Sequence, residues 1–153
     1  MTSDQQSHLK GVRGWLLFLC VILTFLTPLS LLAAIGKGEA FADSIRARFP
    51  AYATIVTMSE FANFGFFCYS INVGVSLWRT KKGAVIKAQT FLIAYVAFAV
   101  LRVFMPYLGD LTVDIRGKIV DIYIWNSFRV FIPVVIWHQY LARSVRVKDT
   151  FPG

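Results

Sequence analysis

Residues 119–141, IVDIYIWNSFRVFIPVVIWHQYL, decide the fold class of this chain. The run has the roughly 20 residues that a helix needs to cross the hydrocarbon core of a bilayer, and yet Asn126 and Arg129 lie inside it. A charged side chain at that depth costs on the order of 3 kcal/mol on translocon-derived scales unless it finds partners. We therefore expect other segments of the chain to supply polar partners for these two side chains.

Three further apolar runs of similar length occupy residues 15–35, 52–78 and 84–108. Hydrophobic residues make up 57% of the chain, against about 45 to 50% in a typical soluble domain. Four crossings use most of the chain and leave no length for a separate soluble domain. We predict an all-α fold, a four-helix transmembrane bundle that forms a single integral membrane domain over residues 1–153.

The net charge of +8 fits a membrane topology better than a nucleic-acid partner, because the basic residues flank the spans instead of covering one soluble face. With both termini inside, nine Lys and Arg residues lie on the cytoplasmic side and five lie outside, as the positive-inside rule requires. The nine are Lys10, Arg13, Arg79, Lys81, Lys82, Lys87, Arg143, Arg146 and Lys148, and the five are Lys37, Arg46, Arg48, Arg116 and Lys118. Both termini are therefore predicted to be cytoplasmic.

Local patterns add three expectations. Pro28 lies inside the first span and lacks an N–H, so we expect a kink or a polar neighbour beside the carbonyl that it releases. Phe41, Ile45 and Phe49 recur every four residues, which favours either a short helix in the headgroup layer or an irregular loop. In residues 109–118 apolar and polar residues alternate, which predicts a short extended segment.

Small and polar residues gather on one face of each of the last three spans, and such faces normally point toward other helices. The second span places Ser59, Glu60, Asn63, Ser70 and Gly74 on one face. The third aligns Ala84, Ala88, Phe91, Tyr95, Phe98 and Arg102, and the fourth aligns Asn126, Arg129, Pro133, Trp137 and Tyr140.

The charged residues of these faces fall at similar depths. Counted from the outer ends of their spans at about 1.5 Å per residue, Glu60, Arg102 and Arg129 lie roughly 12, 9 and 15 Å deep. Asn63 and Asn126 belong to the same layer. We predict that these five residues form a ligand-binding polar cluster in the outer half of the bundle.

Two interpretations of this layer stay open. In one, Glu60 pairs with Arg102, Arg129 or both, and the pairing only fixes the helix register. In the other, two guanidiniums against one carboxylate leave a positive charge, which an anionic lipid headgroup or a small anion completes. The alternative function is a small oligomeric transporter, coupled to protons or ions, that uses Glu60.

Enzymatic motifs are missing from the sequence. His8 and His138 are the two histidines, and neither H-E-x-x-H nor G-x-S-x-G occurs. No catalytic residue, metal site or cofactor is predicted. We expect a non-enzymatic binding or accessory component whose partners are membrane lipids, with a protein partner or a second copy of the chain as further possibilities.

Two stretches resemble a known family. GVRGWLLFL (residues 11–19) and WHQYLARSVRVKDTF (residues 137–151) are similar to small bacterial inner-membrane proteins known as domain of unknown function 2569. The matching residues are Gly14, Trp15, Leu16, Trp137, Tyr140, Ser144, Arg146, Val147, Lys148, Thr150 and Phe151, whereas His138 and Gln139 depart from the more apolar residues of the family. The resemblance implies a bacterial inner-membrane location with four spans and both ends inside, and it implies no activity or ligand.

Overall fold

The structure is a computed structural model that describes residues 14–36 and 47–151, and this part of the chain contains helices and turns but no strand. The first apolar run comprises α2 (Trp15–Val21), the π-helical turn η1 (Ile22–Leu26) and α3 (Thr27–Gly36). There follow α5 (Pro50–Trp78), α6 (Ala84–Phe104), the 3-10 turn η2 (Met105–Tyr107), α7 (Val113–Arg143) and α8 (Val145–Thr150). The all-helical fold class is confirmed.

Three helical stretches are long and apolar enough to cross a membrane, namely Trp15–Ala33, Ala84–Tyr107 and Val113–Arg143. The fourth long helix, α5, has 29 residues and is therefore about 43 Å long. Its polar residues Ser59, Asn63, Ser70 and Ser76 are buried inside the protein.

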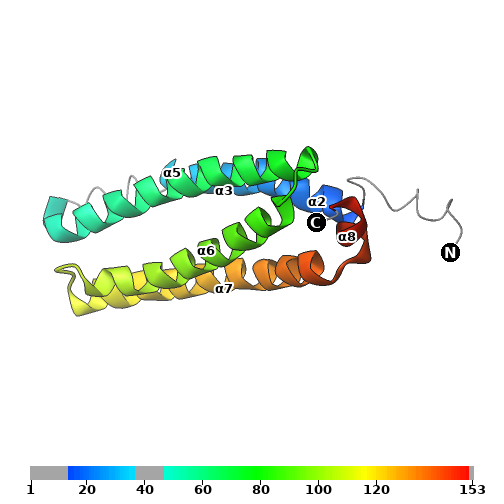
Figure 1. The fold of residues 1–153 in the computed structure, drawn as a ribbon. Helices are drawn as coiled ribbons and strands as arrows, with labels where there is room; N and C mark the ends of the chain where they lie inside the picture. The colour runs from blue at the N-terminus through cyan, green and yellow to red at the C-terminus, as the bar shows by residue number, and fades with distance from the viewer. Residues whose placement is uncertain (1–13, 37–46, 152–153) are drawn as a thin grey trace, which may run out of the picture.

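The long helices lie side by side in a fixed order (Figure 1). Helix α3 packs on α5, α5 packs on α6, and α6 packs on α7. The start of α2, the turn from α5 to α6 and the short α8 lie at one end of the molecule, which we call the terminal end. Helix α5 begins and α6 passes into α7 at the opposite end, which we call the far end.

The π-helical turn before Pro28 is held by α5. Thr27 N–H donates to the carbonyl of Ile22, five residues back, and the next such donor would be Pro28, which has no N–H. The Leu23 carbonyl that Pro28 leaves free instead accepts a 2.6 Å hydrogen bond from the buried Ser70 hydroxyl. The expected polar neighbour of the proline is therefore Ser70.

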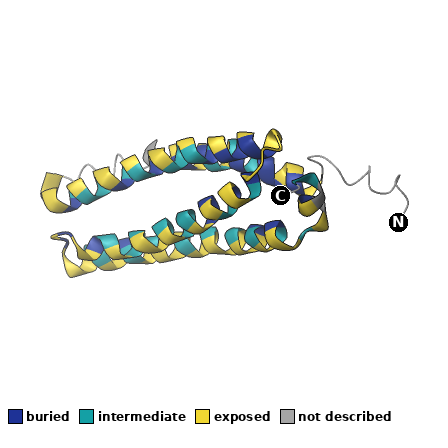
Figure 2. Ribbon diagram, viewed as in Figure 1, coloured by how far each residue is buried: buried dark blue, intermediate teal, exposed yellow. Residues whose placement is uncertain are grey.

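An apolar core closes the terminal end. It joins side chains of α2, α5, α6, α7 and α8, including Leu16, Leu19, Cys20, Val73, Leu77, Ala84, Ala88, Trp137, Leu141 and Val147. The rings of Trp15 and Phe18 lie 6.2 and 5.8 Å from the ring of Trp137. The two stretches that carry the family resemblance thus meet in space, and dark blue buried residues are concentrated here in Figure 2.

A smaller apolar cluster lies at the far end. Phe49, Tyr52, Leu111 and Ile119 are its buried members. Gly109 brings the chain between α6 and α7 against α5, because a Cβ at this position would lie 2.9 Å from the Cβ of Tyr52.

The predicted extended segment is wrong over most of its length, because α7 begins at Val113, six residues before the apolar run. Thr112 is extended and Asp114 lies in the first turn, where a carboxylate complements the helix dipole. The Arg116 guanidinium donates to the Leu111 carbonyl at 3.0 Å. The headgroup-layer helix suggested by Phe41, Ile45 and Phe49 falls largely in residues 37–46, outside the described part of the chain.

Candidate functional site

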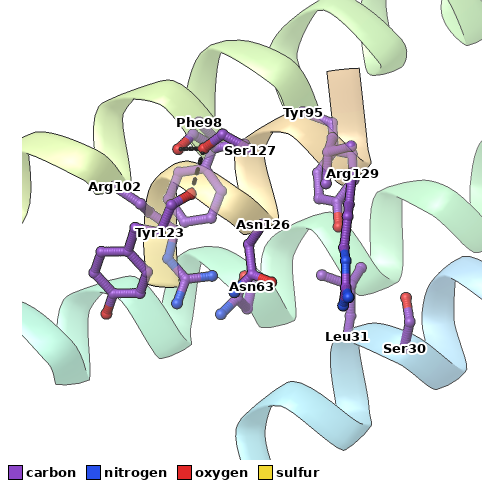
Figure 3. Close-up of a pocket in the computed structure, with 12 residues that line it drawn as sticks. Ser30, Leu31, Asn63, Tyr95, Phe98, Arg102, Tyr123, Asn126, Ser127 and Arg129 are labelled. Carbon is purple, nitrogen blue, oxygen red and sulfur yellow. Dashed lines mark hydrogen bonds between the residues drawn. The ribbon is translucent and has the colours of Figure 1, made fainter. Parts of the chain in front are cut away.

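Four of the five residues predicted for the polar cluster line a single cavity of about 290 Å³. Asn63, Arg102, Asn126 and Arg129 are brought together, and Glu60 is not among the lining residues. We call this cavity the arginine pocket (Figure 3). Its described lining consists of Ser30 and Leu31 from α3, Asn63 from α5, Tyr95, Phe98, Ala99 and Arg102 from α6, and Tyr123, Asn126, Ser127, Arg129 and Val130 from α7.

Helix α5 contributes the most deeply buried polar group. Asn63 is 3% exposed, and it faces the same side of α5 as Ser59 and Ser70, which are also buried. Spacings of four and seven residues keep these positions on one side of an α-helix. The inward polar face predicted for this span is therefore present, and it delivers an amide to the pocket.

A hydrogen bond between α6 and α7 fixes which residues of the two helices face each other at the pocket. The Ser127 hydroxyl lies 2.9 Å from the Ala99 carbonyl of α6 and 2.8 Å from the Tyr123 carbonyl of its own helix. One hydroxyl proton is shared between the two acceptors. This contact holds Ala99 opposite Ser127. Arg102 and Tyr123 lie one turn nearer to the far end than this pair.

Arg102 is held by aromatic rings. Its guanidinium carbon lies 4.9 Å from the centroid of the Tyr123 ring and 5.8 Å from that of Phe98, distances within the range of cation–π attraction. Its Nε is buried and has no hydrogen-bond partner in the described part of the chain. A buried guanidinium N–H without an acceptor can donate a hydrogen bond to a bound anion.

Arg129 occupies a more open position. It is exposed, and its guanidinium carbon lies 5.4 Å from the ring centroid of Trp125, which is also exposed. In Figure 3 Arg102 and Arg129 both extend from the α6–α7 side toward α5 and α3, with Asn63 and Asn126 between them. The pocket thus offers two guanidiniums and two amides along one row.

No carboxylate occurs among the described lining residues. Glu60 lies nearly one turn before Asn63 on α5 and is partly buried. Its pairing with Arg102 or Arg129 stays a prediction. Among the described residues no group of His, Cys, Asp or Glu is arranged to hold a metal ion.

Several lining residues were absent from the predicted site. The predicted stripe of Arg102 contains Tyr95 and Phe98, but the predicted site does not include them. Tyr123 and Ser127 also lie outside the predicted site, although each is next to Asn126 in sequence or one helical turn away. A tyrosine one turn from the mid-span Asn126, and a serine beside it, are the available signals.

The chain matches the model of a known protein family. The model of the family described as "Protein of unknown function (DUF2569)" matches residues 9–152. No curated protein and no solved structure matches the chain.

Proposed function

The chain belongs to the DUF2569 family, and on that premise and the geometry of the arginine pocket we propose that it is a non-enzymatic membrane protein that binds an anionic group. It is a four-span protein of the bacterial inner membrane with both termini in the cytoplasm. Because α5 packs on both α3 and α6, it lies beside helices that are apolar enough to span. Its outward residues Met58, Phe61 and Phe64 are exposed and apolar, as a lipid-facing side requires.

The charge of the lining carries the proposal. Two guanidiniums and two amides face one cavity, and the described lining contains no acid. Arginine presents a planar fork that binds carboxylate or phosphate oxygens in pairs. At about 290 Å³ the cavity lies at the lower end of the range for small-molecule sites, so it suits one headgroup or a small anion.

The pocket favours binding over proton-coupled transport. The transporter alternative needs a carboxylate at the site of coupling, and Glu60 lies outside the described lining. Four helices also offer little structure for alternating access within one copy. We therefore assign the pocket a binding or accessory role.

Thermal unfolding in an uncharged detergent tests the proposal. Inorganic phosphate or a short-chain phosphatidylglycerol should raise the unfolding temperature of the wild type saturably, because a ligand that binds only the folded state stabilises it. Arg102→Gln and Arg129→Gln should abolish the shift. Arg143→Gln is the matched control, because Arg143 is exposed in the last turn of α7, away from the pocket. A shift that is equal in all four proteins, or absent from the wild type, would overturn the proposal.

A further inference from the structure

We infer that the arginine pocket takes its anion from the bilayer, as the phosphate of a membrane lipid that enters sideways between α3 and α7. This inference rests on the proposed function and adds the source and the route of the ligand. It follows from which sides of the pocket are closed, from the exposure of the lining, and from the depth of the two arginines.

Aromatic side chains pack at both ends of the pocket. Toward the terminal end, the Phe66 ring lies 5.1 Å from Phe98 and 6.1 Å from Phe91, between α5 and α6. Toward the far end, the hydroxyl of the buried Tyr52 lies 3.4 Å from the hydroxyl of Tyr123, within the far-end apolar cluster. These aromatic contacts narrow the path that a hydrated anion would follow along the helix axes.

The remaining side lies between α3 and α7. Helix contacts run from α3 to α5, from α5 to α6 and from α6 to α7, whereas α3 and α7 make little direct contact. Both nevertheless line the pocket. Among the described helices, the seam between these two is where the wall of the pocket is not sealed by helix packing.

The exposure of the lining residues also indicates that the pocket is open at the α3–α7 seam. On α3 and α7, Ser30, Asn126 and Arg129 are exposed, whereas Tyr123 and Ser127 are partly buried. On α5 and α6, Asn63 is buried and Arg102 is partly buried. The lining therefore changes from open to closed on going from the α3–α7 seam toward the α5–α6 interface.

The seam is bordered by apolar side chains. Leu29 on α3 and Trp125 and Ile132 on α7 are exposed, and in a bilayer such side chains contact acyl chains. A ligand at this seam therefore meets cations inside and hydrocarbon outside. A phosphate ester that carries acyl chains suits both surroundings, because its phosphate binds the cations and its acyl chains lie in the hydrocarbon. A free anion suits only the cations.

Depth agrees with a lipid source. Arg102 lies six residues before Leu108 at the far end of α6 and η2, a rise of about 10 Å. Helix α7 has 31 residues and so spans about 46 Å, close to the full thickness of a bilayer with its headgroups. Arg102 thus lies near the boundary between headgroups and hydrocarbon, where a lipid phosphate needs only a short displacement to reach it, and Arg129 lies deeper.

Native mass spectrometry of protein released from nanodiscs of phosphatidylcholine and phosphatidylglycerol tests the inference. The wild type should retain one phosphatidylglycerol, and added inorganic phosphate should not displace it. Arg102→Gln and Arg129→Gln should each reduce retention about tenfold or more, the effect of losing one charge-assisted hydrogen bond. Arg143→Gln should retain the lipid as the wild type does.

A plug in the seam tests the route. Ser30→Trp places a large ring on the exposed α3 border of the pocket, and it should reduce phosphatidylglycerol retention while the thermal shift with inorganic phosphate persists. Ser30→Ala is the control for loss of the hydroxyl, which donates only to the Thr27 carbonyl of its own helix. If Ser30→Trp does not fold, Leu29→Trp on the same exposed border of α3 replaces it.

The outcomes separate this inference from the proposed function. If inorganic phosphate stabilises the wild type but no lipid is retained, the anion site stands and the lipid source is wrong. If lipid is retained equally by the arginine variants, it binds elsewhere and the inference is overturned. If neither ligand binds, both proposals fail.

Discussion

The terminal end and the arginine pocket are built from the same four long helices, but the terminal end is a packed apolar core and the pocket is a polar cavity. At the terminal end, Leu16, Leu19 and Val73 are fully buried in an apolar core. In the pocket, two charged and two amide side chains share a cavity, and two of them are exposed. In a bilayer, where lipid tails are as apolar as leucine, close packing supplies most of the association between helices.

The difference identifies where stability and function lie. The terminal end combines small residues, backbone contacts and aromatic rings, and it joins the two stretches shared with the family. The pocket keeps the buried Arg102 Nε without an acceptor among the described residues, which lowers stability but permits binding. Substitutions should therefore destabilise the protein at the terminal end and leave it intact, or even stabilise it, at the pocket.

The largest expected effect is at Gly74. A Cβ at this position would lie 3.1 Å from the Cα of Thr24 and closer still to its hydroxyl, so Gly74→Val must push η1 away from α5. We expect a loss of roughly 3 kcal/mol of unfolding free energy, at the upper end of overpacking effects. Equilibrium unfolding in mixed micelles measures it.

Gly65→Val on the same helix is the matched control for Gly74→Val. A Cβ at Gly65 meets nothing within 4 Å, so its stability should change by less than about 1 kcal/mol. Equal losses for the two variants would mean that helix propensity, and not the approach of η1 to α5, determines the effect.

Ser70 should give the second largest effect. Ser70→Ala removes the donor to the buried Leu23 carbonyl, and an unsatisfied buried acceptor costs about 1 to 3 kcal/mol. Pro28→Ala should recover part of that loss in the double variant, because it restores an N–H that can reach the same carbonyl. Ser76→Ala, which removes a bond to the Asn72 carbonyl of its own helix, should cost less. Strictly additive losses for Ser70→Ala and Pro28→Ala would contradict this coupling.

Much of the pocket could be predicted from the sequence, because polar residues in long apolar runs must face inward and their depth follows from counting. This reasoning placed Asn63, Arg102, Asn126 and Arg129 in one layer, and the structure places all four around one cavity. The same reasoning could not predict that Asn63 lines the cavity and that Glu60 does not. The polar face of α5 is wide enough to be shared between two neighbouring elements, so a single periodicity does not say which side chain meets which neighbour.

Element ends were harder to predict for a physical reason. An apolar run measures the thickness of hydrocarbon, whereas a helix can continue through the headgroup layer with polar residues. Helix α7 therefore begins at Val113, and its first turns contain Asp114, Arg116 and Lys118. The π-helical turn depends on Ser70, which lies 47 residues from Leu23, so no local pattern could reveal it.

The smallest expected effect has the opposite sign and is at Arg129. In bicelles of zwitterionic lipid, Arg129→Leu should raise the unfolding free energy by on the order of 2 kcal/mol. An arginine in hydrocarbon costs about 3 kcal/mol, and the contact with Trp125 returns only about 0.5 to 1 kcal/mol at an exposed site. Arg143→Leu should instead lower stability slightly, because a cation in the last turn complements the helix dipole.

Phosphatidylglycerol should reduce or reverse the difference in unfolding free energy between Arg129→Leu and the wild type. The wild type then gains the free energy of the bound lipid, and the variant does not. A loss of stability in Arg129→Leu without any anionic lipid would show that Arg129 is already satisfied inside the protein. An internal ion pair, such as the predicted one with Glu60, would then account for the pocket, and the distinction between a packed end and a binding layer would no longer hold.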